Sequence, residues 1–117
     1  MITTPLVDAL NNITRDAAAA FISGAEFERE NMHVHHNDGG RVSRLFLFGN
    51  LIAERNRDSI RVTLAGWPTT TTRARLNGLL ELLNINRRFY QLRKVQYFGS
   101  TINNTAREIS AHEWLKL

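Results

Sequence analysis

The sequence contains no cysteine, two prolines and no apolar run that approaches the roughly 20 residues of a membrane-spanning helix. The lack of cysteine excludes disulfides, thiolate metal sites and cysteine nucleophiles, and it fits a reducing compartment. The first ten residues hold Asp8 and no basic residue, so they do not resemble a secretory signal. We therefore expect a cytoplasmic protein that makes no contact with membranes.

Carboxylates are also scarce over most of the chain. Residues 1–40 carry six acidic and two basic residues, a net charge of −4, whereas residues 41–94 carry eleven basic and three acidic residues, a net charge of +8. The pattern predicts a single domain, 1–117, with an acidic N-terminal arm, 1–40, and a basic body, 41–117. A basic body suits a polyanionic partner, although thirteen arginines are also what a GC-rich genome would encode.

Apolar residues at helical spacing predict two helices. A threonine and a proline at 4–5 form a favourable helix start, and the apolar stripe that follows predicts a helix over residues 5–22 that could break near 11–12. This stripe could cover a sheet, or it could pair with a second copy of the chain and make a homodimer. Four leucines at positions i, i+3, i+4 and i+7 predict a second helix over residues 71–83.

Strand signals fall between and after the two helices. Residues 26–48 alternate on either side of an Asn-Asp-Gly-Gly turn, which predicts a hairpin, and residues 59–64 alternate cleanly. Aromatic runs on either side of Arg93 and Lys94 predict a second hairpin. The sequence therefore predicts an α+β fold in which an antiparallel sheet of about five strands carries two helices.

Two segments of the chain resemble a known family. They are residues 47–54, LFGNLIAE, and residues 62–77, VTLAGWPTTTTRARLN. The shared pattern is a GN-IA segment, followed by AGW-T-TT-R-RLN and an aromatic hairpin. In this pattern, over residues 45–98, the chain resembles a family of small tailed-bacteriophage proteins. The resemblance implies a viral protein that works in the host cytoplasm, and it implies no particular activity. Residues 1–40 lie outside it.

Residues able to catalyse reactions form no familiar motif. The sequence has no G-x-S-x-G elbow, no H-E-x-x-H pair and no P-loop, so we predict no enzyme and no cofactor. His33 and His35 would share one face of a strand, and alternating glutamates at 26–30 could add a carboxylate to a zinc site. Because His-x-His pairs are common on exposed strands, the sequence alone predicts no metal.

Two segments are candidates for binding nucleic acid, and the first is the start of the second helix. Thr71 and Thr72 stand there, and Arg73 and Arg75 follow them. A helix N-terminus that also offers hydroxyl and guanidinium donors attracts a phosphate. The alternative is that one threonine caps the helix and the others simply leave the preceding strand.

The second candidate segment is the aromatic–basic hairpin. Its candidate residues are Arg87, Arg88, Tyr90, Arg93 and Lys94. Aromatic faces stack on unpaired bases while cations follow the phosphates, and this use requires Tyr90 or Tyr97 to be exposed. The alternative is an amphipathic hairpin whose aromatic residues belong to the core.

Together these features predict a non-enzymatic phage accessory protein that binds nucleic acid through its basic body. The first alternative is a phage protein for host takeover, which binds and inhibits a host protein or defence complex and uses the acidic arm for recognition. The second alternative is a small virion component whose arm swaps between neighbours.

Overall fold

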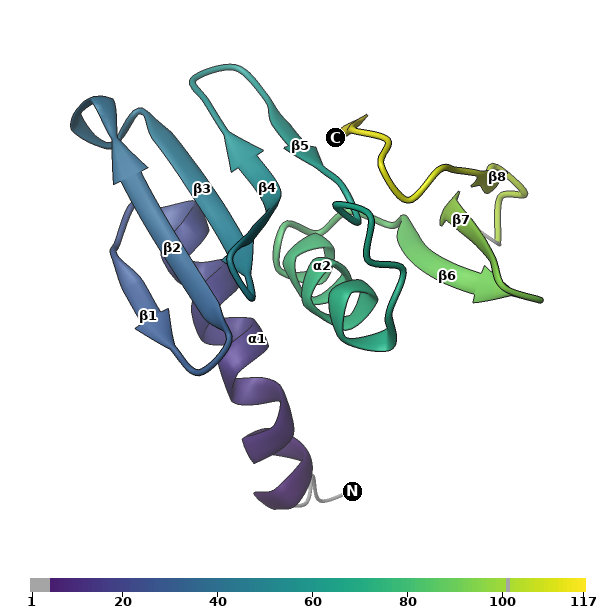
Figure 1. Ribbon diagram of the computed structural model, residues 1–117, viewed down its shortest axis with the longest axis horizontal. Coiled ribbons are helices and arrows are strands. Elements are labelled where there is room, and N and C mark those ends of the chain that lie inside the picture. The colour runs from purple at the N-terminus through teal and green to yellow at the C-terminus, as the bar shows by residue number, and fades with distance from the viewer. Residues whose placement is uncertain (1–4, 101) are drawn as a thin grey trace.

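The computed structural model describes residues 5–100 and 102–117, which form two helices and two antiparallel sheets (Figure 1). The main sheet has six strands in the order β1-β2-β3-β4-β5-β9, and the small sheet has three in the order β6-β7-β8. In chain order the elements are α1 (Pro5–Ser23), β1 (Phe27–Arg29), β2 (Met32–Asn37), a 3-10 turn (Asp38–Gly40), β3 (Val42–Leu47), β4 (Asn50–Arg55), β5 (Ile60–Val62), α2 (Thr70–Leu82), β6 (Arg88–Leu92), β7 (Val95–Gly99), β8 (Arg107–Glu108) and β9 (Leu115–Lys116). The predicted α+β class is confirmed, and the strands divide between two sheets.

Helix α1 covers one face of the main sheet and contacts β1, β2 and β3. Ala17 and Phe21 are fully buried and belong to the same apolar core as Val34 and Leu45 of the sheet. The helix is continuous, without a break near residues 11–12. It ends as the sequence predicts, because Gly24 has a φ of +86° and donates its N–H to a carbonyl of the last turn.

Residues 27–37, which the sequence assigned to an acidic arm, are strands of the main sheet. β2 pairs with β3 along its whole length, from Met32 opposite Leu47 to Asn37 opposite Val42. β1 pairs with β2 and forms one edge of this sheet. Three of the six acidic residues of the N-terminal third, Glu26, Glu28 and Glu30, therefore lie in or next to β1, at a sheet edge that contacts α1.

Helix α2 lies between the two sheets (Figure 1) and contacts both α1 and β6. Its inner side chains, Leu76, Leu79 and Leu80, are buried, as the leucine spacing predicts. The helix starts at Thr70, one residue before the predicted start, because Thr69 is the N-cap and its hydroxyl accepts the Thr72 N–H at 3.1 Å.

The C-terminal residues complete the main sheet, which the sequence analysis did not predict. Leu115 lies opposite Val62 and Lys116 opposite Arg61, so β9 pairs with β5. The strand is only two residues long, and it lacks the alternation that predicts a strand from sequence. In the part of the chain that the structure describes, no helix is long and apolar enough to cross a membrane.

Candidate nucleic-acid interface

The small sheet has one face toward α2 and one face toward solvent. Phe89 and Phe98 are paired across β6 and β7, are buried, and have ring centroids 4.7 Å apart. Tyr90 and Tyr97 form the next cross-strand pair, so they point to the opposite face. Their rings are half-buried and stacked, with centroids 5.3 Å apart and planes 13° apart. The structure thus separates the buried phenylalanine pair from the half-buried tyrosine pair, and neither tyrosine reaches the full exposure on which the sequence-based prediction depends.

Cations stand at both ends of the tyrosine pair. Arg88 shares the outer face of β6 with Tyr90 and is exposed. Arg93 and Lys94 are exposed at the hairpin tip, where they form the two-residue turn between Leu92 and Val95. Among the described residues, no ion-pair partner is recorded for these three cations. We call Arg88, Tyr90, Arg93, Lys94 and Tyr97 the tyrosine face. Glu108, opposite Tyr97 on β8, is the neighbouring acidic residue.

The hairpin tip has a strained backbone. Arg93 and Lys94 have φ values of +51° and +68°, which is the left-handed conformation required at both central positions of a type I′ turn. Asn-Gly is the sequence that this turn prefers, because other residues pay roughly 1–2 kcal/mol for the left-handed conformation. Arg93 and Lys94 therefore occupy two positions where Asn-Gly would give a more stable turn.

Two arginines predicted to bind nucleic acid are instead engaged within the chain. Arg73 Nη1 donates to Pro68 O at 3.1 Å and to Gln96 Oε1 at 3.0 Å, which ties α2 to the hairpin. Arg75 Nη1 donates to Thr14 Oγ1 at 2.6 Å, which ties α2 to α1. Burial lowers the pKa of Arg75, and the charge of Glu30 partly offsets this effect.

The threonine run caps α2 and also lines a groove. Thr72 is 2% exposed and its hydroxyl lies 3.0 Å from that of the N-cap Thr69, so its hydroxyl serves the cap. Thr71 is half-buried and lines a groove of about 440 Å³ together with Phe48 and Trp67. The two segments that resemble phage proteins, residues 47–54 and 62–77, meet at this groove.

Arg87 lines a hollow with other basic residues that sequence reasoning missed. Its guanidinium lies 5.4 Å from the centre of the Phe98 ring. Together with Arg107, Trp114 and Lys116 it lines a hollow of about 310 Å³. No local pattern could have revealed this hollow, because its residues come from both sheets.

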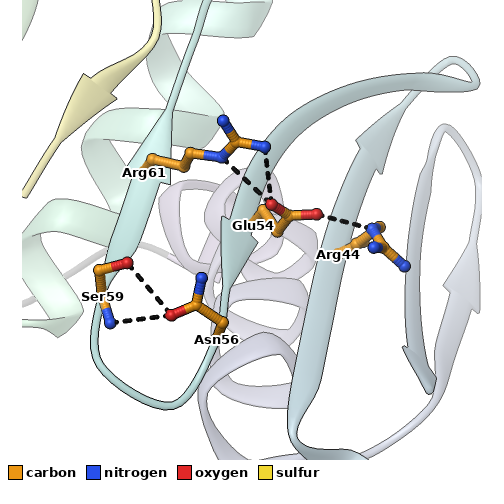
Figure 2. Close-up of polar contacts among 5 residues, drawn as sticks. All are labelled: Arg44, Glu54, Asn56, Ser59 and Arg61. Carbon is orange, nitrogen blue, oxygen red and sulfur yellow. Dashed lines mark hydrogen bonds and ion pairs between the residues drawn. The ribbon is translucent and has the colours of Figure 1, made fainter. Parts of the chain in front are cut away.

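Part of the positive charge on the main sheet is neutralised by Glu54 (Figure 2). Its carboxylate accepts from Arg44 Nε at 2.8 Å and from Arg61 Nη2 at 2.8 Å, across β3, β4 and β5. Burial raises the pKa of Glu54, but the hydrogen bonds and charges of the two arginines outweigh it and leave the pKa below its ordinary value. Arg44 and Arg61 therefore form ion pairs that link neighbouring strands of the main sheet, in contrast to the cations of the tyrosine face.

We expect Glu54→Gln to lower the free energy of unfolding by about 1 kcal/mol at pH 7, because the pair of arginines is only partly shielded from water. Since the folded-state pKa is lowered, the stabilisation is complete above the ordinary pKa of 4.5 and is lost as the pH falls through the folded-state value. Urea unfolding of both proteins from pH 7 to pH 3 measures this difference. A gap that stays constant to pH 3 would contradict the assignment.

The fold and this surface define a small α+β protein that presents stacked tyrosines and cations on one sheet. A model of the Kyanoviridae Gp96 protein matches residues 10–116, so the chain belongs to this family of phage proteins. No curated protein and no solved structure matches the chain. The predicted phage origin is confirmed. The match includes residues 10–40, which the sequence analysis had placed outside the resemblance, so most of the acidic segment is part of the family.

Proposed function

We propose that this phage protein binds single-stranded nucleic acid, without catalysis, through the tyrosine face. The observation that carries the proposal is the stacked pair Tyr90 and Tyr97 on the outer face, with Arg88 at one end and Arg93 and Lys94 at the other. Unpaired bases stack on exposed aromatic rings, and cations follow the phosphates. β6 spans five residues, or about 17 Å at the usual rise, so the cations bracket a short stretch of unpaired strand.

The direct test is fluorescence anisotropy with a labelled single-stranded DNA, a single-stranded RNA and a DNA duplex, each over a series of salt concentrations. We expect tighter binding to the single strands than to the duplex, because duplex bases cannot stack on the tyrosines. We also expect affinity to fall steeply with salt, because phosphate contacts release counterions. A lack of binding to every probe at low salt would overturn the proposal.

The hairpin tip allows binding and stability to be separated. We expect the double variant Arg93→Asn/Lys94→Gly to be more stable by about 1 kcal/mol, because Asn-Gly suits a type I′ turn. The same variant should bind single strands at least about tenfold more weakly and with a shallower salt dependence, because it loses two cations. Chemical unfolding and anisotropy measure the two effects. Since the two changes have opposite signs, weaker binding cannot be attributed to loss of folding.

The matched control is Arg41→Ala/Arg57→Ala, which removes two exposed cations from turns of the main sheet. It changes the net charge equally and should leave most of the binding intact. In addition, Glu108→Gln should tighten binding, because it removes a negative charge beside Tyr97. Equal losses for the two double variants would show that net charge, rather than the tyrosine face, governs binding.

Inhibition of a host protein is the second candidate function, and one observation favours it. Phe48 and Trp67 are 71% and 56% exposed beside the groove of about 440 Å³. Phe48 has a φ of +51° in the tight turn before β4, so an apolar side chain is held outward at a strained position. Exposed apolar patches of this kind mark protein-binding surfaces.

The N-terminal segment is less suited to act alone as the recognition element or as a dimer contact. Ile13, Ala17 and Phe21 of α1 are buried in the core of the same chain, so this part of the stripe is not free to pair with a second copy. The earlier part of the stripe, Leu6 and Leu10, lies outside the described side chains. If a host protein is the partner, we place its contact at Phe48 and Trp67.

A further inference from the structure

The outer face of the β1–β2 edge brings together histidines and glutamates. β1 and β2 pair with Phe27 opposite Val34 and Glu28 opposite His33. One step further along this register, Glu26 lies next to His35, and their Oε1 and Nδ1 atoms are 3.6 Å apart. Side chains that are directly opposite point to the same side of a sheet. Two histidines and two glutamates therefore share this face.

Three of these side chains converge on one point. One donor atom each from Glu26, His33 and His35 can be chosen so that all lie within 4.8 Å of one another. Donors bound to a tetrahedral ion at about 2.0–2.1 Å are about 3.3 Å apart. Because all three side chains are exposed, small rotations about their side-chain bonds close this difference without any change in the backbone.

The surrounding structure orients the carboxylate and one ring. Glu26 Oε2 accepts the backbone N–H of His36 at 3.0 Å, which leaves Oε1 directed toward His35. The ring of His33 lies 5.8 Å from that of Phe46, which is opposite it on β3. Hydrogen bonds and packing around ligands of this kind fix their orientation and support metal binding.

The cation opposite His35 is paired with a carboxylate. Arg44 lies opposite His35 on β3, where a free guanidinium would repel a metal ion. Its Nε donates to Glu54 at 2.8 Å, and this carboxylate, which Arg61 shares, offsets part of its charge (Figure 2). On the other side, Glu28 opposite His33 adds a negative charge. The local charge therefore suits a divalent cation.

We propose that Glu26, His33 and His35 form a site for a divalent transition-metal ion of the zinc type. Two imidazoles and one carboxylate are a ligand set that holds zinc with the fourth position open to water. The ion would link β1 to β2 and thereby secure the edge of the main sheet. The site lies on the other side of the molecule from the small sheet (Figure 1), so it is independent of the proposed nucleic-acid binding.

The sequence alone did not favour this site, and the register of the strands changes that conclusion. A His-x-His pair on an isolated exposed strand offers two ligands at most. The β1–β2 pairing decides which of the alternating glutamates at 26–30 supplies the third ligand and how it is oriented, and neither can be read from spacing. His36 faces the other side, where its Nε2 lies 2.6 Å from Ala25 O and its Nδ1 lies 2.7 Å from Ser43 Oγ.

The test uses the full chain without an affinity tag, stripped of metal with a chelator and titrated with Zn²⁺ by calorimetry. Co²⁺ serves as a spectroscopic probe, because its visible absorption reports nitrogen and oxygen ligands. We expect one ion per chain and a higher unfolding temperature with Zn²⁺. His35→Gln and Glu26→Gln should each weaken Zn²⁺ binding at least about tenfold and abolish the rise in unfolding temperature.

The controls are His112→Gln and Glu81→Gln, which alter an exposed histidine and an exposed glutamate elsewhere on the chain. Both should bind Zn²⁺ as the wild type does. Circular dichroism without metal should be the same for all five proteins, because the substituted side chains are exposed. The proposal is overturned if the wild type binds no Zn²⁺ at millimolar concentration, or if the control variants lose as much affinity as the ligand variants.

Discussion

Replacing Gly99 with alanine should lower the free energy of unfolding by about 3–5 kcal/mol, the largest effect that we expect from a single methyl group in this protein. Gly99 ends β7 with a φ of +145°, a conformation that is essentially restricted to glycine. A Cβ atom there would lie 2.8 Å from both the Ala106 nitrogen and the Thr105 carbonyl oxygen. These are backbone atoms, so relief requires β8 to move away from β7.

The matched control is Gly24→Ala. Gly24 also has a positive φ, +86°, but a Cβ atom there would meet no atom within 4 Å. We expect this variant to lose only about 1–2 kcal/mol, the cost of the left-handed conformation by itself. Urea unfolding of the two variants separates backbone conformation from steric overlap. Equal losses would show that the approach of residues 105–106 to Gly99 is not a constraint.

Replacing Asn77 with alanine should cost about 2–4 kcal/mol. The Asn77 side chain donates to the Phe89 carbonyl at 2.9 Å and accepts the Phe89 N–H at 2.8 Å. It thus pairs with the first part of β6 as a neighbouring strand would, and it attaches the small sheet to α2. Alanine would leave both groups of a buried residue without a partner, and such groups cost about 1–3 kcal/mol each.

Two further substitutions sharpen this test. Asn77→Asp keeps the bond from the Phe89 N–H but cannot donate to its carbonyl, so it should retain only part of the stability. Asn86→Ala changes an exposed asparagine and should stay within about 0.5 kcal/mol of the wild type. If Asn77→Ala also lies within that range, the small sheet is held by its apolar contacts alone. Nucleic-acid binding should fall in parallel with the stability of Asn77→Ala, because the same sheet carries the tyrosine face.

The helices and hairpins were predictable because their causes are local. The leucine spacing of α2, the proline at the start of α1 and the Gly24 end all act within a few residues, whereas the predicted cap at residue 4 lies outside the described residues. The same holds for the hairpin at Arg93 and Lys94, whose flanking strands alternate. The alternative to phosphate binding, that one threonine caps α2, also follows from local chemistry, although only the structure identifies Thr69 as the cap.

The candidate site was only partly predictable. Sequence analysis proposed Arg88, Tyr90, Arg93 and Lys94, and the structure places all four on or beside the outer face of one sheet, with the three cations exposed and Tyr90 half-buried. It gave Arg73 and Arg75 the same role, but the structure engages both with partners at long sequence separation, Gln96 and Thr14. The sequence does not distinguish an arginine that hydrogen-bonds within the chain from one that is available to bind a phosphate.

By itself the sequence determined the class of protein: a cysteine-free α+β chain with phage-like segments and a basic surplus after residue 40. This conclusion rests on composition and on the periodicity of apolar residues, and both can be read along the chain without knowledge of the tertiary contacts. Tertiary structure alone decided which charges are neutralised, which aromatics are reachable, and that Glu26 stands beside His35. These outcomes depend on strand register and on helix–sheet packing, where residues far apart in sequence meet, and a shift of one residue would reverse every face.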